Sequence, residues 1–590
     1  RSSSSSLGNA QSAAIYLIIN MIGHSSSNDN LLDAYAGLLK QCGENTQKEE
    51  IYRIWNLCCS DYPLPEMTID RDLKSLDANY LIDNIDRSYD AWKKAPWHGQ
   101  VSFDTYCQYI LPYRINTERL STIGWRDTLS GRYYPLIRGE KNVKKAFAII
   151  NQYIIHHFRN TQPDYPRQMD ALSIGKIRPG NCSLRCLYTI YVLRALGIPA
   201  CYDFVNYWSN YSTRGHSWVT LVTHPDSTFT LHKGDSLPLF HNRIDGSVFL
   251  ADFLPEETYP YPLDSIKRVA QVFRYTFDKQ NGEHHHEVTS QYGISRPLKM
   301  KNAPVKNGFC DISIFLTGKD WEVIKSVPVH NHRIEVESIG YDQLYLFTYR
   351  DDEGNLVRSV PAIFHSNGRL EYLRGDKRRK ETVVAYRKYP LFIHQTETWC
   401  KMKGCIIEAS NSSDFENSEI LLEIKETPFL FSCHKVKPAK AYRYVRYRNT
   451  NRWATALAEF EVYGKERMKG RPIGSTYDEE VLARGVDRNY LTFVTSYGED
   501  YWYGLDLGNK PSLIERVRFL PKNDANFIEP GHKYEMLYYD NRWISLGMHI
   551  ARCDSLVYEI PANSLTLVRD LTAGKEERPF TYREHTPQWW

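Results

Sequence analysis

The sequence predicts a multidomain α+β protein in which helices come first and β-sheets follow. The chain has 590 residues, more than one hydrophobic core can organise, so we expect three to five domains. Segments 31–42, 49–59 and 142–158 carry apolar residues at helical spacing. After residue 197 the pattern changes to short strands bounded by Gly, Asp and Asn. Because helices and strands are segregated along the chain, an α+β class is favoured.

The overall composition excludes several classes of protein. The chain is 42% hydrophobic and 24% charged, which is typical of a soluble globular protein. Its 74 basic and 70 acidic residues give a net charge of +4. That balance argues against binding driven by phosphate neutralisation, so we predict no nucleic-acid partner. The apolar segment 13–23 is too short to span a bilayer, and no transmembrane span is predicted.

Residues 7–120 are predicted to form a helical N-terminal region. Besides the helices over 31–42 and 49–59, the segment 103–115 predicts a helix that ends near Pro112. The chain begins with Arg1 and a run of serines, which we interpret as a processed or engineered terminus. A lipid anchor on a removed N-terminal segment is compatible with this beginning.

Residues 121–295 are predicted to form an α+β core. The helix over 142–158 is amphipathic, whereas the helix over 182–196 is apolar nearly all round and is therefore expected to be buried. Strands are expected over 200–208, 216–223 and 227–233 and should belong to one sheet.

Cys182 stands at the predicted start of the buried helix. It follows Pro179-Gly180-Asn181, in which Gly permits a tight turn and Asn is a good helix N-cap. A thiol in the first helical turn faces unsatisfied backbone N–H groups and the positive end of the helix dipole, both of which favour the thiolate. We therefore expect Cys182 to be the most reactive of the 12 cysteines.

Cys186 lies one turn further along the same apolar helix, and we interpret it as a packing residue. Burial without a charged partner raises the pKa of a thiol and lowers its reactivity. The competing use of Cys182 and Cys186 is a zinc site completed by Cys201 and His216. That arrangement lacks a CxxC pair and requires ligands inside a helix, so we do not favour it.

His216 opens the strand that follows and is the candidate base. Beside a helix-capping cysteine, a histidine at a strand entrance can form a thiol–imidazole pair. A third group should fix the imidazole tautomer, and Asp235 at the end of the next strand is the candidate. The alternative for Asp235 is a turn residue, and Asp226 is expected in the hairpin turn.

These residues resemble the core of transglutaminase-like proteins, a branch of the papain-like cysteine enzymes. The resemblance rests on GNC at the helix start, LYTIYVLRALGIPA along the helix and GHSW at the strand, and it covers about 140–290. It implies that Cys182 is the nucleophile, His216 the general base and Asp235 the orienting acid. The family includes acyltransferases, peptidases, amidases and members that have lost catalysis.

The second half is predicted to consist of three β domains. Residues 300–380 are interpreted as an immunoglobulin-like β-sandwich. RYVRYR and AEFEVYG in 381–465 resemble discoidin-like (coagulation factor 5/8 type C) β-sandwiches, and 466–590 resembles a second module, a galactose-binding-like jelly roll expected to fold alone. This order of domains resembles large secreted or lipid-anchored proteins of Bacteroidota.

Two candidate ligand sites lie in the last region. The chain has 42 Tyr and 13 Trp, which suit half-buried strands and equally suit sugar-stacking surfaces. Tyr501, Trp502 and Trp543 are candidates for carbohydrate binding, with core packing as the alternative. Asp487 and Asn489 are candidates for a structural calcium; no other cofactor or metal is expected.

The sequence thus predicts an extracytoplasmic cysteine enzyme that is secreted, periplasmic or on the cell surface, including as an outer-membrane lipoprotein. Its reaction would be acyl transfer or hydrolysis at an amide through Cys182, His216 and Asp235. The substrate would be a protein, a peptide, or peptidoglycan or another glycan. The alternative is a non-catalytic glycan- or protein-binding surface protein with a degenerate core.

Overall fold

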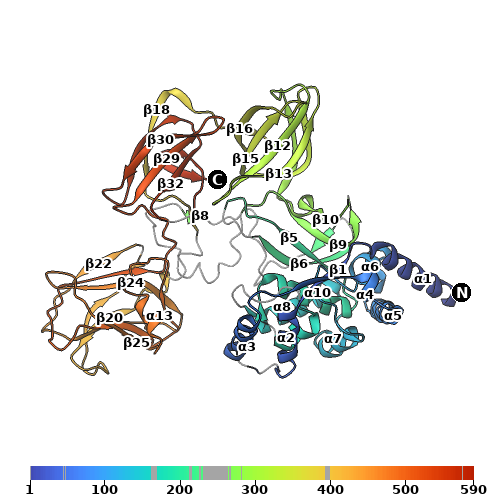
Figure 1. The fold of residues 1–590 in the computed structure, drawn as a ribbon, viewed down its shortest axis with the longest axis horizontal. Helices are drawn as coiled ribbons and strands as arrows, with labels where there is room; N and C mark the ends of the chain where they lie inside the picture. Colours follow the sequence, from blue (N-terminus) through green and yellow to red (C-terminus); the bar gives the residue numbers. More distant parts are fainter. Residues whose placement is uncertain are drawn as a thin grey trace.

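The predicted division into helices followed by sheets is confirmed (Figure 1). The structure is a computed structural model that describes residues 2–43, 46, 48–160, 169–177, 179–210, 215–224, 227–229, 263–264, 268–280, 282–392, 399–428, 430–573 and 576–590. Helices dominate the first 200 residues, and antiparallel sheets follow. No helix in this part of the chain is long and apolar enough to cross a membrane.

The helical part is built around one buried helix, α10. Several of its other helices begin at residues whose side chains cap them: Asp29, Asp77, Ser102 and Asn142 each accept a hydrogen bond from a backbone N–H in the first turn. The helices are α1 (Ser2–Asn20), α2 (Asn30–Leu39), α3 (Lys48–Asp61), α4 (Asp72–Ser75), α5 (Ala78–Lys94), η1 (His98–Gln100), α6 (Phe103–Tyr109), α7 (Trp125–Tyr133), η2 (Tyr134–Ile137), α8 (Val143–His157), α9 (Ala171–Ile177) and α10 (Cys182–Ala195).

Helix α10 is buried because other elements cover it on every side. It contacts α5, α7, α8 and α9, and it also packs against two strands of the adjacent sheet. Of its 14 residues, 11 are buried. Gly197 ends it in a left-handed conformation, and a Cβ there would lie 2.4 Å from the carbonyl oxygen of Ala91 on α5. The apolar sequence of 182–196 is therefore explained by its central position.

One hydrophobic cluster runs from Ala13 to Leu221 and includes Phe277. The N-terminal helices and α10 consequently share a core. The domain boundary predicted between residues 120 and 121 does not separate two cores, because apolar faces on both sides of it pack together.

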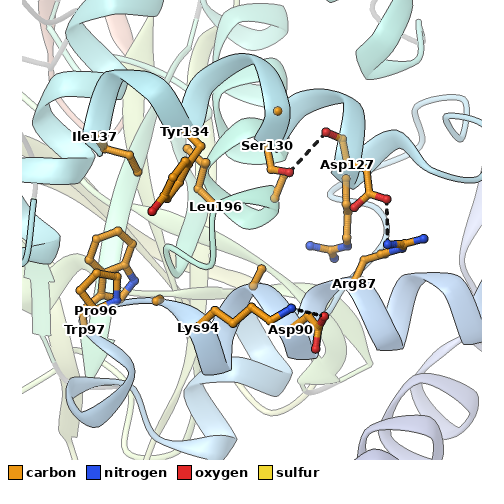
Figure 2. Close-up of a pocket in the computed structure, with 15 residues that line it drawn as sticks. Arg87, Asp90, Lys94, Pro96, Trp97, Asp127, Ser130, Tyr134, Ile137 and Leu196 are labelled. Atoms are coloured by element: carbon orange, nitrogen blue, oxygen red, sulfur yellow. Dashed lines mark hydrogen bonds and ion pairs between the residues drawn. The ribbon is translucent and has the colours of Figure 1, made fainter. Parts of the chain in front are cut away.

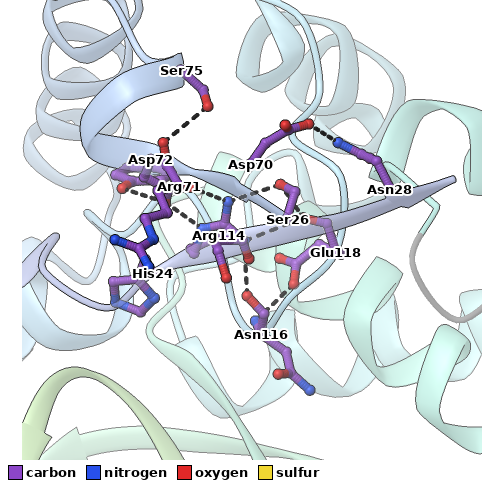
Figure 3. Close-up of polar contacts among 12 residues, drawn as sticks. His24, Ser26, Asn28, Asp70, Arg71, Asp72, Ser75, Arg114, Asn116 and Glu118 are labelled. Atoms are coloured by element: carbon purple, nitrogen blue, oxygen red, sulfur yellow. Dashed lines mark hydrogen bonds and ion pairs between the residues drawn. The ribbon is translucent and has the colours of Figure 1, made fainter. Parts of the chain in front are cut away.

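A buried polar cluster joins Asp72, Ser26 and Glu118 around Arg114 (Figure 3), and it reaches α10 through Glu118. Arg114 donates two hydrogen bonds of 2.6 Å to the carboxylate of Asp72, and both side chains are almost fully buried. The same guanidinium donates to the hydroxyl of Ser26 and to the carbonyl of Glu118. The carboxylate of Glu118 in turn accepts the hydroxyl of Tyr191 on α10 at 2.8 Å. The cluster also involves the paired strands β1 (Ser25–Asp29) and β2 (Met67–Arg71).

The sheet against α10 has the strand order β10-β9-β5-β6-β7, all antiparallel. Its strands are β5 (Ala200–Val205), β6 (His216–His224), β7 (Ser227–Phe229), β9 (Phe273–Gln280) and β10 (Glu283–Glu287). The prediction that β5, β6 and β7 share one sheet is confirmed. Short parallel pairs join β3 (Arg159–Asn160) to β4 (Pro179–Gly180) and β8 (Leu263–Asp264) to β19 (Leu391–Phe392).

The first β unit, over residues 295–372, has its own core. One sheet has the order β13-β12-β15-β16-β17, and β11 pairs with β14. The strands are β11 (Ser295–Lys301), β12 (Gly308–Leu316), β13 (Asp320–Val329), β14 (Arg333–Gly340), β15 (Gln343–Arg350), β16 (Leu356–Phe364) and β17 (Leu370–Tyr372).

The next β unit differs from the prediction, because it spans the boundary proposed between residues 465 and 466. Strand β23 pairs with β27 and β24 pairs with β28, so hydrogen bonds and one hydrophobic cluster cross that point. The sheets are β21-β20-β23-β27-β25 and β22-β28-β24-β26. They contain β20 (Ile406–Ser410), β21 (Glu419–Glu423), β22 (Ser432–Lys435), β23 (Tyr444–Arg448), β24 (Thr455–Tyr463), β25 (Arg471–Gly474), β26 (Val494–Ser496), β27 (Trp502–Asp506) and β28 (Arg516–Pro521), with helix α13 (Glu479–Ala483) beside β25.

The last β unit is assembled from two separated segments. Strand β18 (Asp376–Ala385) pairs with β31 (Leu556–Ala562), and their side chains share a cluster with the C-terminal strands. The C-terminal sheet has the order β30-β29-β32-β33-β34. Its strands are β29 (Lys533–Tyr539), β30 (Trp543–Ile550), β32 (Thr566–Asp570), β33 (Phe580–Arg583) and β34 (Thr586–Trp589). The preceding unit is thus inserted between β18 and the strands that complete this one.

This topology predicts which fragments fold. A fragment of residues 399–528 should unfold cooperatively, because it contains both sheets and the whole cluster between them. A fragment of residues 466–590 should not unfold cooperatively, because three of its strands lack their partners. In this fragment β27 lacks β23, β28 lacks β24 and β31 lacks β18. Thermal unfolding followed by circular dichroism distinguishes them, and cooperative unfolding of 466–590 would contradict the strand pairing.

Candidate active site

Cys182 occupies the first turn of α10, as predicted. The side chain of Asn181 caps the helix by accepting the N–H groups of Ser183 at 3.0 Å and Leu184 at 3.2 Å. The cap leaves the thiol of Cys182, which is half-buried, beside the positive end of the helix dipole. Such a position favours the thiolate form of the side chain.

His216 is the first residue of β6 and lies beside Cys182. Its backbone is opposite Val205, the last residue of β5. The preceding Gly215 allows this approach, because a Cβ there would lie 2.1 Å from the carbonyl oxygen of Val205. The side chain of His216 is hydrogen-bonded to the sulfur of Cys182. The structure therefore brings two of the predicted site residues together.

The surroundings of Cys182 favour its ionised form. Burial raises the pKa of the thiol, but the hydrogen bond and charge of His216, together with hydrogen bonds from Ser217, lower that pKa to about 6. At neutral pH most Cys182 side chains are then thiolates, whereas an ordinary cysteine with a pKa of about 8.5 is only a few per cent ionised. This is the electrostatic arrangement of an activated sulfur nucleophile.

Ser217 and Tyr202 are site residues that the sequence reasoning missed. Ser217 is buried and contacts the sulfur of Cys182 through both its side chain and its backbone. Its hydroxyl lies 3.4 Å from that of Ser183, and Tyr202 on β5 is hydrogen-bonded to both serines. Burial raises the pKa of Tyr202, so its phenol stays protonated. Ser217 lies two positions before Val219 on β6, and Val219 belongs to the hydrophobic cluster that includes α10, so strand alternation could have indicated that Ser217 faces α10.

The other cysteines near the site are packing residues. Cys186 is 2% exposed and belongs to the main hydrophobic cluster, as predicted. Cys201 is fully buried and donates weakly to the Asp203 carboxylate at 3.4 Å and the Thr220 carbonyl at 3.6 Å. Within the described residues no group of three or more His, Cys, Asp or Glu side chains is placed to hold a metal ion. The zinc alternative therefore gains no support.

We expect Cys186→Ala to act on stability rather than on the thiol chemistry. Removing a buried sulfur leaves a small cavity, which should lower the free energy of unfolding by on the order of 1 kcal/mol. The pH profile of Cys182 alkylation should be unchanged, since the neighbours of Cys182 that set its pKa are His216 and Ser217. A thermal melt tests the expected loss of stability, and alkylation kinetics on the same sample test the pH profile of Cys182. An unchanged melting temperature with an altered profile would contradict the assignment.

Asp235, the predicted third member of the triad, lies outside the described residues, as does Asp226. The orientation of the His216 imidazole by Asp235 stays a prediction.

The three aromatic residues predicted to bind carbohydrate have different surroundings. Trp502 packs on Phe415 with ring centroids 5.4 Å apart. Trp543 donates its indole N–H to Asp320 at 2.9 Å, a contact between the last and the first β units. These contacts favour the packing interpretation for both tryptophans. Tyr501 is 38% exposed, and sugar binding there stays a prediction.

The candidate calcium ligands are engaged with their own loop. The carboxylate of Asp487 accepts the N–H of Asn489 at 2.8 Å and the hydroxyl of Thr492 at 2.8 Å. These bonds are those of a local turn that an aspartate stabilises without a metal. A calcium ion at this loop stays a prediction.

A separate cavity of about 440 Å³ lies at the opposite end of α10, between α5 and α7 (Figure 2). Four of its charged side chains form two ion pairs: Arg87 with Asp127 at 2.9 Å, and Lys94 with Asp90 at 2.7 Å. Because Leu196 lines this cavity and Cys182 stands at the other end of the helix, the cavity is not part of the thiol site.

No protein-family model matches the sequence, and no curated protein matches it. A thiolate and a neighbouring imidazole at the positive end of a helix dipole suit attack on an electrophilic carbonyl carbon.

Proposed function

We propose that this protein is a cysteine enzyme of the transglutaminase-like type, which transfers or hydrolyses acyl groups at amide bonds. The observation that carries the proposal is the pair formed by Cys182 and His216 at the start of α10, where hydrogen bonds and charge lower the pKa of the thiol to about 6 despite burial. A cysteine that only fills space has no need of such partners.

In the proposed first half-reaction, the sulfur of Cys182 attacks the amide carbonyl carbon and forms a C–S bond. The carbonyl oxygen becomes an oxyanion, which the positive end of the α10 dipole stabilises. His216, protonated in the ion pair, gives its proton to the leaving nitrogen as the C–N bond breaks. An amine departs, and a thioester remains on Cys182.

In the second half-reaction, water or an amine attacks the thioester carbon while His216 accepts its proton. The C–S bond breaks, the product leaves, and the thiolate–imidazolium pair is restored. Water gives a peptidase or amidase, and an amine gives a transferase. In this proposal Asp235 orients the imidazole, and the three β units serve as accessory modules for a protein, peptide or glycan-linked substrate outside the cytoplasm.

The test is formation of an acyl-enzyme. The protein is incubated with a mixture of acylated peptide amides, with and without hydroxylamine as acceptor, and intact-protein mass spectrometry follows the adduct. We expect a thioester on Cys182 and hydroxamate products, both absent in Cys182→Ala. A wild-type protein that forms neither adduct nor product, although its thiol titrates near pH 6, would favour the non-catalytic alternative.

A further inference from the structure

Two indole rings flank the imidazole of His216. The ring of Trp208 lies 6.0 Å from it at 26°, and the ring of Trp218 lies 6.2 Å from it at 25°, measured between centroids and planes. Both tryptophans are almost fully buried, with exposed fractions of 5% and 0%. Nearly parallel rings at these separations restrict the planes that the imidazole can adopt.

The position of Trp218 is itself fixed by polar contacts on the same face of the sheet. Its indole N–H donates to the hydroxyl oxygen of Tyr292 at 2.9 Å, and Tyr292 donates to the carboxylate of Asp203. Asp203 also accepts two hydrogen bonds of 2.8 Å from Arg274, and the pair is fully buried. The hydroxyl of Thr220 donates to the same carboxylate at 2.9 Å.

The strand register explains why these groups meet. Asp203 on β5 lies directly opposite Trp218 on β6 and Arg274 on β9, and Val205 lies opposite His216. Since residues two apart on a strand share a face, Trp218 and His216 lie on the face that carries the Asp203–Arg274 pair. The contacts therefore begin at a buried ion pair and end at Trp218, two residues along β6 from His216.

The protonation states of Tyr292 and His286 are compatible with this set of hydrogen bonds. Burial and the neighbouring negative charge of Asp203 raise the pKa of Tyr292 well above its ordinary value, so its phenol stays protonated and a donor to Asp203. Its oxygen then keeps lone pairs for the indole N–H of Trp218. Burial, with Arg274 nearby, lowers the pKa of His286 on β10, so this neighbour is neutral near pH 7.

We propose that Trp218 and Tyr292 are positioning residues, which hold the imidazole of His216 in hydrogen-bonding geometry with Cys182 through the buried Asp203–Arg274 pair. This inference rests on the proposed function, because it concerns the same thiol–imidazole pair. It assigns a role to two residues 74 positions apart that neither touch the sulfur nor act as acid or base.

The test is Tyr292→Phe, which removes the hydroxyl and keeps the ring that packs edge-on against Trp218 at 5.6 Å. The readout is the pH profile of Cys182 alkylation by iodoacetamide, which requires no substrate. The groups facing Cys182 are His216 on β6, Tyr202 on β5 and Cys186 on α10; the phenol of Tyr202 does not ionise in this range. We expect the midpoint to rise by about half to one pH unit, and the rate near pH 6 to fall about two- to fivefold.

Tyr345→Phe is the matched control. The Tyr345 hydroxyl is buried and donates to the carbonyl of Gly340 at 2.7 Å in the first β unit. Both variants should lose some thermal stability, but only Tyr292→Phe should move the midpoint. Trp218→Phe removes the indole N–H that donates to Tyr292, so it should raise the alkylation midpoint by a similar amount. The double variant should raise the midpoint no further than either single variant.

The outcomes separate the two proposals. A wild-type midpoint at or above the ordinary thiol value of about 8.5 overturns the proposed function itself. A wild-type midpoint near 6 that neither Tyr292→Phe nor Trp218→Phe moves, with only the melting temperature reduced, leaves the enzyme proposal intact and overturns the positioning role.

Discussion

Replacing His216 with Ala is expected to slow alkylation of Cys182 near pH 6 by about ten- to hundredfold. Without the imidazole, burial is no longer offset by its hydrogen bond and charge, so the pKa of the thiol rises from about 6 toward or above its ordinary value. The thiolate fraction near pH 6 then falls by about two orders of magnitude or more. The greater intrinsic nucleophilicity of a more basic thiolate recovers only part of that loss.

The exposed cysteines Cys433 and Cys553 are internal controls in the same sample. In the wild type, half-buried Cys182 should react faster than either near pH 6, and the advantage should disappear above about pH 8.5, where ordinary thiols ionise. In His216→Ala only the Cys182 rate should change. Mass-spectrometric mapping at several pH values measures all three rates, and an unchanged Cys182 rate in the variant would contradict the pair.

Asp72→Ala is expected to lower the free energy of unfolding of the helical part by about 3–5 kcal/mol. It removes the carboxylate that accepts two hydrogen bonds from Arg114, whose side chain is fully buried, and leaves that charge with weaker compensation in the interior. Because this cluster also reaches Tyr191 on α10 through Glu118, the loss should extend to the helix that carries Cys182.

Urea unfolding monitored by tryptophan fluorescence measures this effect, with Trp125 and Trp218 buried in the helical part and its sheet. Asp127→Asn is the comparison variant, since it weakens the exposed ion pair with Arg87 and should hardly change the unfolding midpoint. Equal effects of the two variants would show that burial of the Arg114–Asp72 pair is not what stabilises this region.

Local signals in the sequence predicted the centre of the site. Asn181 before Cys182 indicated where α10 begins, and the apolar composition of the helix indicated that Cys186 is buried; both are confirmed. His216 was expected to open a strand, and it does. These predictions succeeded because capping and hydrophobic periodicity act over a few residues, so the sequence displays them directly.

Contacts between distant segments could not be predicted in the same way. Arg274 meets Asp203 across 71 residues, and nothing near either residue in the sequence identifies the partner. The β units show the same limit. RYVRYR and AEFEVYG indicate strands, but the pairing of β23 with β27 and of β24 with β28 depends on tertiary packing. A period of two residues predicts that a strand exists without specifying its neighbour.

The most direct test of the account is a pH titration of the ultraviolet thiolate absorbance of the wild type, with Cys182→Ser as the reference. The difference between the two proteins isolates the ionisation of Cys182 from that of the other cysteines. We expect a difference signal with a midpoint near pH 6, the value to which His216 and Ser217 lower the pKa of Cys182. A midpoint at or above about 8.5, typical of an unassisted thiol, would contradict the thiolate–imidazole pair.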